Sequence, residues 1–409
     1  MGILDFFTGK SKRSGGQLTY DDGIKAGLIH RDSISTSNMV VSEYTAFGVT
    51  AIKTAVQVIS EAIGSFPLTL YKDTDQGREK DKNHPYYTLL HDSPNPEVTR
   101  NVLWETVMKN ALLYGTGYLE LERNKAGEVI NMWILHPVHV TPWRTPENNY
   151  KLQYRVHTRN ANEVFLDPSE LIVIPGIGDD GSYGYDLLRL CRDAIGFSIS
   201  CNRAGEAFFA NGCRLSGTLN VPSGKLSPEV KVQTKKDWDE HFSGVKNIGQ
   251  TPILDQGMTY NPLTFTNEAG LYTETRTFQI TEVSRLFNIN PTKLHELGRA
   301  TWANLSTLNE DFYITTLRPW IEKIESELEK KLQLYTTENY CEFNVDAILR
   351  GDITTRYTAY KTAIEAGFMT QDEVRELENL PKLPPAMKIP PQIGATANGN
   401  TLSDQSMDE

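Results

Sequence analysis

The run ELIVIPGIGDDGSYG places three glycines directly after a strand-like apolar segment. Gly176, Gly178 and Gly181 match the G-x-G-x-x-G pattern, whose glycines let a backbone approach the pyrophosphate of a dinucleotide at the start of a helix. Asp179 and Asp180 count against that chemistry, because two carboxylates would repel a pyrophosphate. The preceding segment also looks like an antiparallel hairpin, whereas a dinucleotide site opens a parallel βαβ unit. The turn therefore indicates either a nucleotide-binding enzyme or a flexible loop that joins a β unit to a helix.

Two histidines, His136 and His139, are spaced at i and i+3 across Pro137, and such a pair can begin a zinc site. No cysteine or carboxylate is placed as a third ligand, so we expect structural or surface histidines and no metal. The sequence also lacks the nucleophile-elbow, P-loop and H-E-x-x-H motifs. We therefore expect no catalytic residue, no cofactor and no enzymatic activity.

A basic and aromatic cluster lies in KVQTKKDWDEHF, a combination that can contact nucleic acid. Acidic residues interrupt the positive run, which favours a solvated helix with Trp238 and Phe242 packed beneath it. A surface that docks another protein is the functional alternative. The candidate docking residues are Lys231, Lys235, Lys236 and Trp238.

Composition narrows the class of protein. The chain has 409 residues, of which 39% are hydrophobic, and this is enough for two or three domains. Its formal charge of −11 disfavours tight binding to duplex DNA, which needs concentrated lysine and arginine. The four cysteines show no C-x-x-C spacing, and no apolar run reaches the roughly 20 residues of a membrane span. We expect an intracellular soluble protein with reduced thiols.

Hydrophobic periodicity in the first half of the chain predicts an α+β unit. Residues 1–41 are polar and predict a flexible arm. One helix is expected over 42–66 and another over 101–114, ending at Gly115, with a turn-rich connection at 84–100 between them. Strands are expected at 68–73, in a hairpin over 117–135, and at 150–157 and 170–175.

In the second half, two long helices, expected over 185–211 and 271–286, flank a small β-α-β insert. Because both helices could run antiparallel, this organisation describes a domain on a stalk. A strand near 340–349 and a helical hairpin follow, and the second helix of the hairpin starts with a capping box of Thr370 and Glu373. The insert carries strands at 216–222, 251–255 and 258–265 and a helix at 227–242.

The stretch LSTLNEDFYITTLRPWIEKIESELEKKL predicts one long helix after a polar lead-in. Its apolar residues keep helical spacing from Leu305 to Phe312 and again from Leu317 to Leu332, but the register slips by about one residue between the two halves. Pro319 cannot donate a backbone hydrogen bond, so we expect a kink at this slip.

Several runs resemble, in order from about residue 45 to 381, the portal (head-to-tail connector) proteins of tailed bacteriophages. The strongest are FFANG at 208–212, the ATxxN turn at 300–304 together with Pro319-Trp320, and RGD at 350–352. The resemblance implies an α+β portal-type fold that assembles as a ring. It implies a flexible arm (1–41), an α/β wing (42–184), a stem helix (185–212), a β-α-β clip (213–266), a second stem helix (267–288), a tunnel loop (289–303), a long kinked helix (304–334), a wing strand with crown helices (335–381) and a disordered tail (382–409).

The function that this resemblance implies is a non-enzymatic ring, typically of about twelve subunits, at one vertex of the capsid. Such a ring is assembled in the host cytoplasm, becomes part of the virion and passes double-stranded DNA without sequence specificity, driven by the separate terminase ATPase. Its implied partners are copies of itself, the terminase large subunit, the major capsid or scaffolding protein and head-tail adaptor proteins, and no membrane. A monomeric adaptor that binds one protein through the clip-like insert remains an alternative. The implied channel residues are Lys293, His295, Glu296, Arg299, Thr301, Trp302 and Asn304, and the lysines and tryptophan of the clip would dock the terminase.

Overall fold

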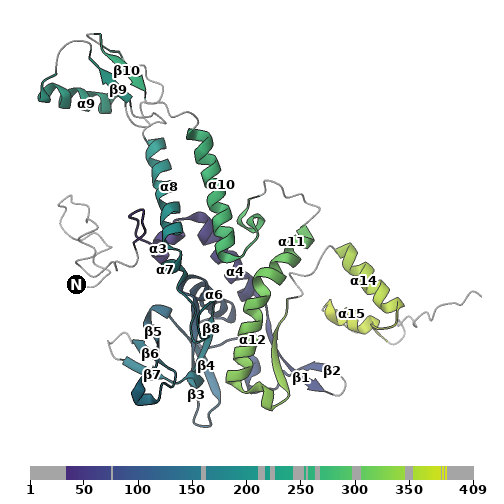
Figure 1. Ribbon diagram of the computed structural model, residues 1–409. Helices are drawn as coiled ribbons and strands as arrows, with labels where there is room; N and C mark the ends of the chain where they lie inside the picture. Colours follow the sequence, from purple (N-terminus) through teal and green to yellow (C-terminus); the bar gives the residue numbers. More distant parts are fainter. Residues whose placement is uncertain are drawn as a thin grey trace, which may run out of the picture. The chain divides into compact units, whose positions relative to one another are not determined.

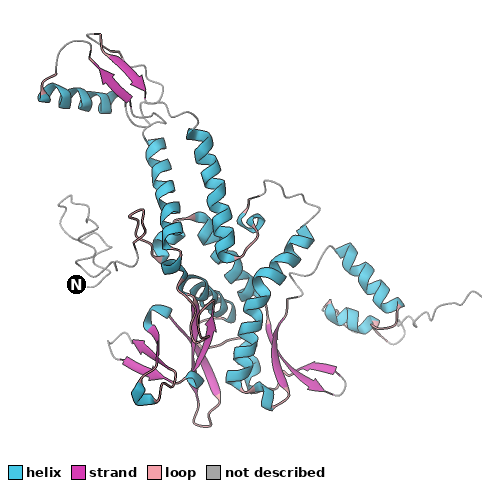
Figure 2. Cartoon of the chain, in the orientation of Figure 1, coloured by secondary structure: helices cyan, strands magenta, loops and turns pink. Residues whose placement is uncertain are grey.

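Figure 1 shows the fold in a computed structural model, and Figure 2 shows its secondary structure. The chain divides into two compact units. The first unit comprises Met1–Ala300 and Ile314–Asn344, and the second comprises Thr301–Tyr313 and Val345–Glu409. Helices and strands are mixed along the chain, as the sequence predicts. The structure describes residues 34–74, 77–157, 163–210, 217–221, 226–242, 253–254, 257–262, 268–296, 305–345, 353–378, 380–381 and 383–384.

The first unit begins with α3 (Glu43–Phe47) and α4 (Thr50–Ser65), where the sequence predicts a single helix. The helix is interrupted because Gly48 caps α3, donating its N–H to carbonyls at the end of that helix. The predicted flexible arm also ends earlier than residue 41. Thr36 donates its N–H to the Asp193 carboxylate at 2.8 Å, so this part of the arm is held in place.

Two short strands and a helix separate α4 from α6 (Arg100–Tyr114), which ends at Gly115 as predicted. The sequence predicts a turn-rich connection at 84–100, and this is wrong for Pro85–His91, which form the helix α5. Pro85 occupies the first turn of that helix, and His84 Nδ1 accepts the N–H of Tyr86 at 3.1 Å. The strands are β1 (Leu68–Thr74) and β2 (Gly77–Lys80).

In the described part of the first unit, three antiparallel sheets have three strands each. In one of them β1 lies between β2 and β11 (Asn339–Phe343), so a strand from a distant part of the sequence completes the sheet. The predicted hairpin and the strands predicted after it are confirmed, whereas β5 (Val140–Trp143) and β7 (Glu163–Leu166) were not predicted. The other sheets have the orders β4-β3-β8 and β5-β6-β7, formed by β3 (Thr116–Arg123), β4 (Val129–Leu135), β5 (Val140–Trp143), β6 (Gln153–His157), β7 (Glu163–Leu166) and β8 (Leu171–Pro175).

The helix predicted over 185–211 is divided at Cys191 into α7 (Leu187–Leu190) and α8 (Arg192–Ala210). Beside α8 runs α10 (Glu268–Phe287), whose Arg276 donates to the Asn202 side chain (Figure 1). Between these helices the chain forms a small unit in which β9 pairs antiparallel with β10. Within the predicted strand 251–255, the described residues 253–254 are not in a strand. The small unit consists of β9 (Gly217–Asn220), α9 (Pro228–Phe242) and β10 (Thr259–Pro262).

A π-helix (Phe312–Leu317) interrupts the long helix predicted over 304–334. It joins α11 (Leu305–Asp311) to α12 (Arg318–Leu332). Because a π-helix bonds residue i to i+5, it takes up one more residue than an α-helical turn, which accounts for the register slip. Phe312 and Leu317, both buried, are separated by this interval. Pro319 lies in the first turn of α12, directly after the π-helix in which the register slip falls. The kink that we expect from Pro319 at this slip stays a prediction.

The second unit contains the predicted helical hairpin, α14 (Ile353–Glu365) and α15 (Gln371–Leu377). The predicted capping box is confirmed, since Thr370 donates its N–H to the Glu373 carboxylate at 2.7 Å and Glu373 donates its N–H to the Thr370 hydroxyl at 3.2 Å. Among the described residues of either unit, no helix has the length and apolar character needed to cross a membrane. Short 3-10 helices lie at Pro137–His139, Pro146–Asn148, Pro168–Glu170, Pro291–Leu294 and Leu334–Thr336.

Candidate functional site

The glycine turn after β8 is packed tightly against the backbone of the β3 segment. Gly176 donates its N–H to the Gly115 carbonyl at 2.8 Å, and Gly184 donates its N–H to the Thr116 hydroxyl at 2.9 Å. A Cβ atom added to Gly178 would lie 2.0 Å from the Tyr183 carbonyl oxygen. Gly176, Gly178 and Gly184 therefore allow backbone segments to approach more closely than a side chain would permit.

This geometry does not provide the phosphate cradle that a dinucleotide site needs. β8 runs antiparallel to β3, so the turn does not open a parallel βαβ unit. Hydrogen bonds from the Ser182 hydroxyl and N–H hold the pKa of Asp180 below its usual range, which keeps a negative charge in the turn. Tyr185 donates its N–H to the Ile177 carbonyl at 2.7 Å and closes the turn. These contacts favour the structural interpretation of Gly176, Gly178 and Gly181.

α12 packs against the same turn. A Cβ atom on Gly176 would lie 3.5 Å from the ring of Trp320. Lys323 donates to the Pro175 carbonyl at 3.0 Å, and its ammonium lies 4.9 Å from the centroid of the Trp320 ring. The Pro319-Trp320 pair, which contributes to the portal resemblance, thus positions a ring that supports the glycine turn.

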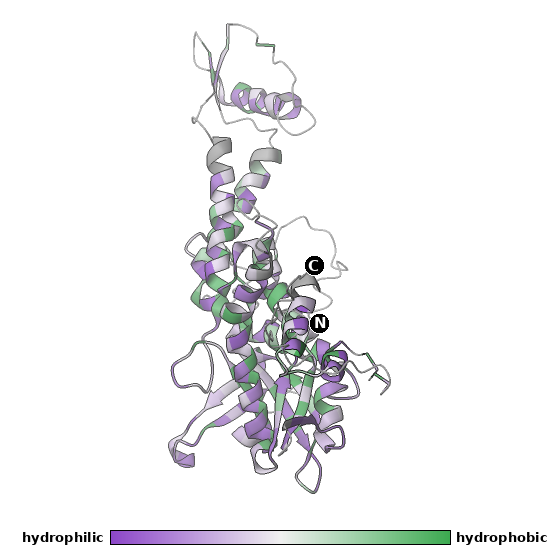
Figure 3. Ribbon diagram, turned by 90° about the vertical axis from the view of Figure 1, so that its right-hand side faces the viewer, coloured by the Kyte–Doolittle hydropathy of each residue, from purple (hydrophilic) through white to green (hydrophobic). Residues whose placement is uncertain are grey.

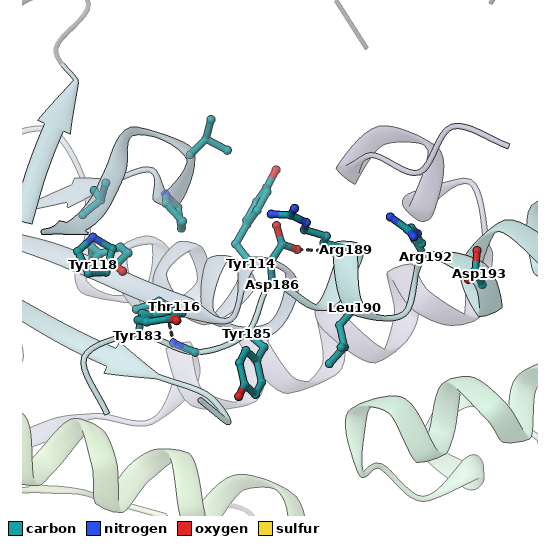
Figure 4. Close-up of a pocket in the computed structure, with 15 residues that line it drawn as sticks. Tyr114, Thr116, Tyr118, Tyr183, Tyr185, Asp186, Arg189, Leu190, Arg192 and Asp193 are labelled. Atoms are coloured by element: carbon teal, nitrogen blue, oxygen red, sulfur yellow. Dashed lines mark hydrogen bonds between the residues drawn. The ribbon is translucent and has the colours of Figure 1, made fainter. Parts of the chain in front are cut away.

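A cavity of about 590 Å³ opens beside this turn (Figure 4). Its walls come from the end of α6 and the start of β3, from residues 137–142, and from residues 183–193. In Figure 4 the polar ends of Tyr114, Arg189 and Arg192 lie on one side of the backbone. The apolar side chain of Val138 is 62% exposed at this cavity. Sequence analysis missed the cavity because its walls are distant in the sequence.

A charged cluster borders the cavity at Tyr114. Lys109 Nζ and Tyr114 Oη each donate to the Glu43 carboxylate at 2.8 Å. Burial acts to raise the pKa of Glu43, but these hydrogen bonds outweigh it and the pKa is lowered. Burial lowers the pKa of the neighbouring His136, whose ring centroid lies 6.0 Å from that of His139. No group of three or more possible metal ligands occurs in the part of the chain that the structure describes.

The candidate docking cluster on α9 is divided by the fold. Trp238 stacks on Tyr260 of β10 with ring centroids 5.1 Å apart. The Tyr260 ring in turn covers Gly217, where an added Cβ would lie 2.3 Å from a ring carbon. Trp238 therefore packs the helix onto the β9–β10 pair, as the solvated-helix interpretation predicts. The exposed residues are Lys231, Lys235 and Lys236, on a helix that is largely hydrophilic (Figure 3).

Three of the candidate channel residues lie among those that the structure describes. Lys293 is in the 3-10 helix Pro291–Leu294, and burial lowers its pKa. His295 is exposed and ends that helix in the left-handed conformation, with φ of 64°. Glu296 donates its N–H to the Pro291 carbonyl at 3.2 Å. Arg299, Thr301, Trp302 and Asn304 lie outside the described residues.

Two carboxylates of α12 cover the edge of β11 that faces away from β1. Phe343 donates its N–H to Glu325 at 2.7 Å, and Cys341 donates its N–H to Glu329 at 3.4 Å. The two glutamates are one helical turn apart and so match alternate residues of the strand. Burial raises the pKa of Glu325 to about 7, although the bond from Phe343 opposes this shift. In the sequence these residues look like ordinary exposed helix glutamates.

Comparisons with known proteins agree with the resemblance in the sequence. The sequence model described as "Phage portal protein" matches residues 50–379. The chain is 26% identical over 397 residues to the probable portal protein of Streptomyces phage phiC31, covering 91% of this chain and 86% of that protein. It is 25% identical over 383 residues to the portal protein of Enterobacteria phage HK97, covering 92% and 89% of the two chains.

A solved structure shares the fold. It is a chain from the neck of a native gene transfer agent particle, obtained with C12 symmetry. The TM-score is 0.58 at 22% sequence identity, and the match covers 83% of this chain and 92% of that one. Because the family's sequence model spans most of its length, the chain belongs to the phage portal protein family.

Proposed function

We propose that this chain forms the portal ring at one vertex of a phage capsid, through which DNA is packaged and later ejected. The observation that carries the proposal is the family match over residues 50–379, which extends across both compact units. The small unit flanked by α8 and α10 supports it, since this is the arrangement expected for a clip on a two-helix stem. The net charge of −11 also suits a channel in which DNA must slide, because lysine and arginine contacts would hold its phosphates.

In this proposal the ring is built in the host cytoplasm with the major capsid or scaffolding protein. It docks the terminase large subunit during packaging and head-tail adaptor proteins afterwards. We assign α8 and α10 to the stem, and β9, α9 and β10 to the clip. The three-stranded sheets of the first unit belong to the wing, and α14 and α15 to the crown.

Electron microscopy of the purified chain, together with native mass measurement, tests the assembly. We expect closed rings of about twelve copies. A chain that stays monomeric under all conditions, including in the presence of scaffolding protein, would favour an adaptor that binds a single protein. Saturable micromolar binding of NAD or ATP in a calorimeter would instead revive the nucleotide-binding interpretation of the glycine turn.

The exposed lysines of α9 test the proposed terminase contact. Replacing both Lys235 and Lys236 with glutamate should weaken the binding of rings to the terminase large subunit about tenfold, or about 1.4 kcal/mol, because both charges at the docking surface are reversed. Surface plasmon resonance with immobilised rings measures the change. The control replaces Lys330 and Lys361, two exposed lysines outside α9, with glutamate. Equal affinities of the two variants would remove these lysines from the docking surface.

Replacing Trp302 with alanine tests the tunnel-loop assignment, which rests on the family resemblance. The variant should assemble into rings, yet package or retain less DNA, because a tryptophan contact worth about 2 kcal/mol or more is lost at the channel. Ring formation is scored by microscopy, and packaged genomes are counted by quantitative PCR of nuclease-treated particles. Tyr335→Ala removes an exposed aromatic ring elsewhere and is the control. A normal genome yield from Trp302→Ala particles would contradict the assignment.

A further inference from the structure

One face of the stem helix α8 carries apolar side chains that a single subunit leaves exposed. Phe197 is 50% exposed on this face, and Leu190, which precedes it by two turns at the end of α7, is 68% exposed. Ala194 and Ala204 are exposed and Cys201 is half-buried on the same face. These five residues follow one another at intervals of four and three, which is the heptad spacing of a helix face that packs against a second helix.

Four residues of this face have the arrangement that accepts a large side chain from a facing helix. Such a hole is formed by residues at i, i+3, i+4 and i+7. On α8 these positions are held by Phe197, Ser200, Cys201 and Ala204. Ser200 and Cys201, in the middle, are less exposed than Phe197 and Ala204 at the two ends. We call these four residues the α8 hole.

The other stem helix carries a side chain of the right kind at the same height. Phe278 of α10 is 55% exposed. The helices α8 and α10 are antiparallel (Figure 1), with Arg276 bonded to Asn202 and Gln279 bonded to Cys201, so Phe278 is level with the α8 hole. Phe278 is about 100° around α10 from Gln279 and about 160° from Arg276, so it points away from the α8 hole of its own subunit.

Unpaired charges beside the two faces are complementary. Arg203 on α8 and Glu274 on α10 are both exposed, and neither has a charged partner among the described residues. Glu274 precedes Phe278 by one turn on one helix, and Arg203 lies towards the same end of the stem on the antiparallel helix. A second α10 that placed Phe278 in the α8 hole would therefore bring Glu274 level with Arg203.

We propose that α8 of one subunit packs against α10 of the adjacent copy, with Phe278 in the α8 hole and Glu274 paired with Arg203. The inference rests on the proposed ring, because rotation about an axis parallel to the stem moves α10 sideways without changing its height. The contact joins two different faces of the chain, which is the head-to-tail kind that repeats around a closed ring. Burial of the exposed apolar side chains supplies the driving force.

Disulfide formation in the full-length protein tests where the copies touch. Cysteine in place of Phe278 would face the native Cys201 of the adjacent copy, and side chains of a packed knob and hole are close enough for a disulfide. Oxidised Phe278→Cys protein should therefore give a ladder at multiples of the monomer mass on a non-reducing gel, and adding Cys201→Ser should remove it. Phe368→Cys, which replaces a phenylalanine that is 73% exposed in the second unit, is the matched control and should give no ladder.

A charge exchange tests the same contact without new cysteines. Arg203→Glu should raise the protein concentration needed for half-maximal ring assembly about tenfold, because it places two carboxylates opposite each other. Adding Glu274→Arg should restore assembly, whereas Lys125→Glu, at an exposed lysine outside the stem, should have no effect. Sedimentation velocity measures the fraction of protein in rings.

The results separate this contact from the ring itself. If the native protein forms rings but Phe278→Cys gives no ladder, or if Arg203→Glu and Lys125→Glu assemble equally well, the α8–α10 contact is wrong and the ring function stands. A native protein that forms no rings would contradict both.

Discussion

Replacing Gly184 with alanine should leave the protein largely insoluble or lower its unfolding temperature by roughly 10 °C or more. The added Cβ would lie 2.1 Å from the Gly115 carbonyl oxygen and 2.7 Å from the Gly176 nitrogen. Both are backbone atoms that join the glycine turn to β3, so they cannot move without breaking the bond between Gly176 and Gly115. We expect a loss of about 4 kcal/mol or more, which is at the upper end for single substitutions.

Gly181→Ala provides a control within the same turn. No atom lies within 4 Å of a Cβ added there, although its φ of 75° disfavours an L-residue. The expected cost is about 1–2 kcal/mol. Differential scanning calorimetry at one fixed protein concentration compares the two variants, because assembly makes the transition concentration-dependent. If both variants unfolded at the same temperature, the close backbone contact would not be what requires glycine at position 184.

Replacing Glu325 with glutamine should stabilise the protein at pH 8 and have little effect at pH 5. The pKa of Glu325 is about 7 in the folded protein, above its usual 4.5, so folding favours the protonated carboxyl. This contribution to stability is complete below pH 4.5 and is lost as the pH rises through 7. Glutamine stays neutral, and its side-chain oxygen can still accept the N–H of Phe343. We expect a gain of about 1–2 kcal/mol at pH 8, after allowance for the partial exposure of the carboxyl.

Urea unfolding of both proteins between pH 5 and pH 8 measures this difference. Glu147→Gln, at an exposed position in the 3-10 helix Pro146–Asn148, is the control and should leave the pH dependence unchanged. A Glu325→Gln protein that is less stable than the native protein at pH 8 would show that the strand edge requires a charged acceptor.

The sequence predicts best the features that short segments determine. The capping box of Thr370 and Glu373, the left-handed end of α6 at Gly115 and the β3–β4 hairpin each depend on residues close in the chain, and each is confirmed. The interruption at Gly48 was missed because helical periodicity continues on both sides of it. α5 was missed because proline and polar residues around it resemble a turn, although Pro85 favours the start of a helix.

The candidate sites were harder to predict because they depend on distant segments. Glu325 covers a strand edge only when β11 returns beside α12, and nothing in its local sequence distinguishes it from Glu322. The glycine turn shows the limit of a spacing match, since Gly176, Gly178 and Gly181 fit a cofactor motif although Gly176 packs against Gly115 and Gly178 against Tyr183. On α9, Trp238 packs against Tyr260 whereas the lysines are exposed. This difference was partly predictable, because acidic residues among the lysines already indicated a solvated helix.

At the π-helix Phe312–Leu317 the chain can lose a residue with little loss of folding free energy. Removing one residue from this segment would convert it to a regular α-helix, and the side chains before and after it would keep their rotational phase. The same deletion within α12 would rotate one part of that helix by about 100° relative to the other and misplace its buried stripe. Insertions and deletions of a single residue in this helix are therefore expected to accumulate at the π-helix, while Leu317 to Leu332 keep a fixed spacing.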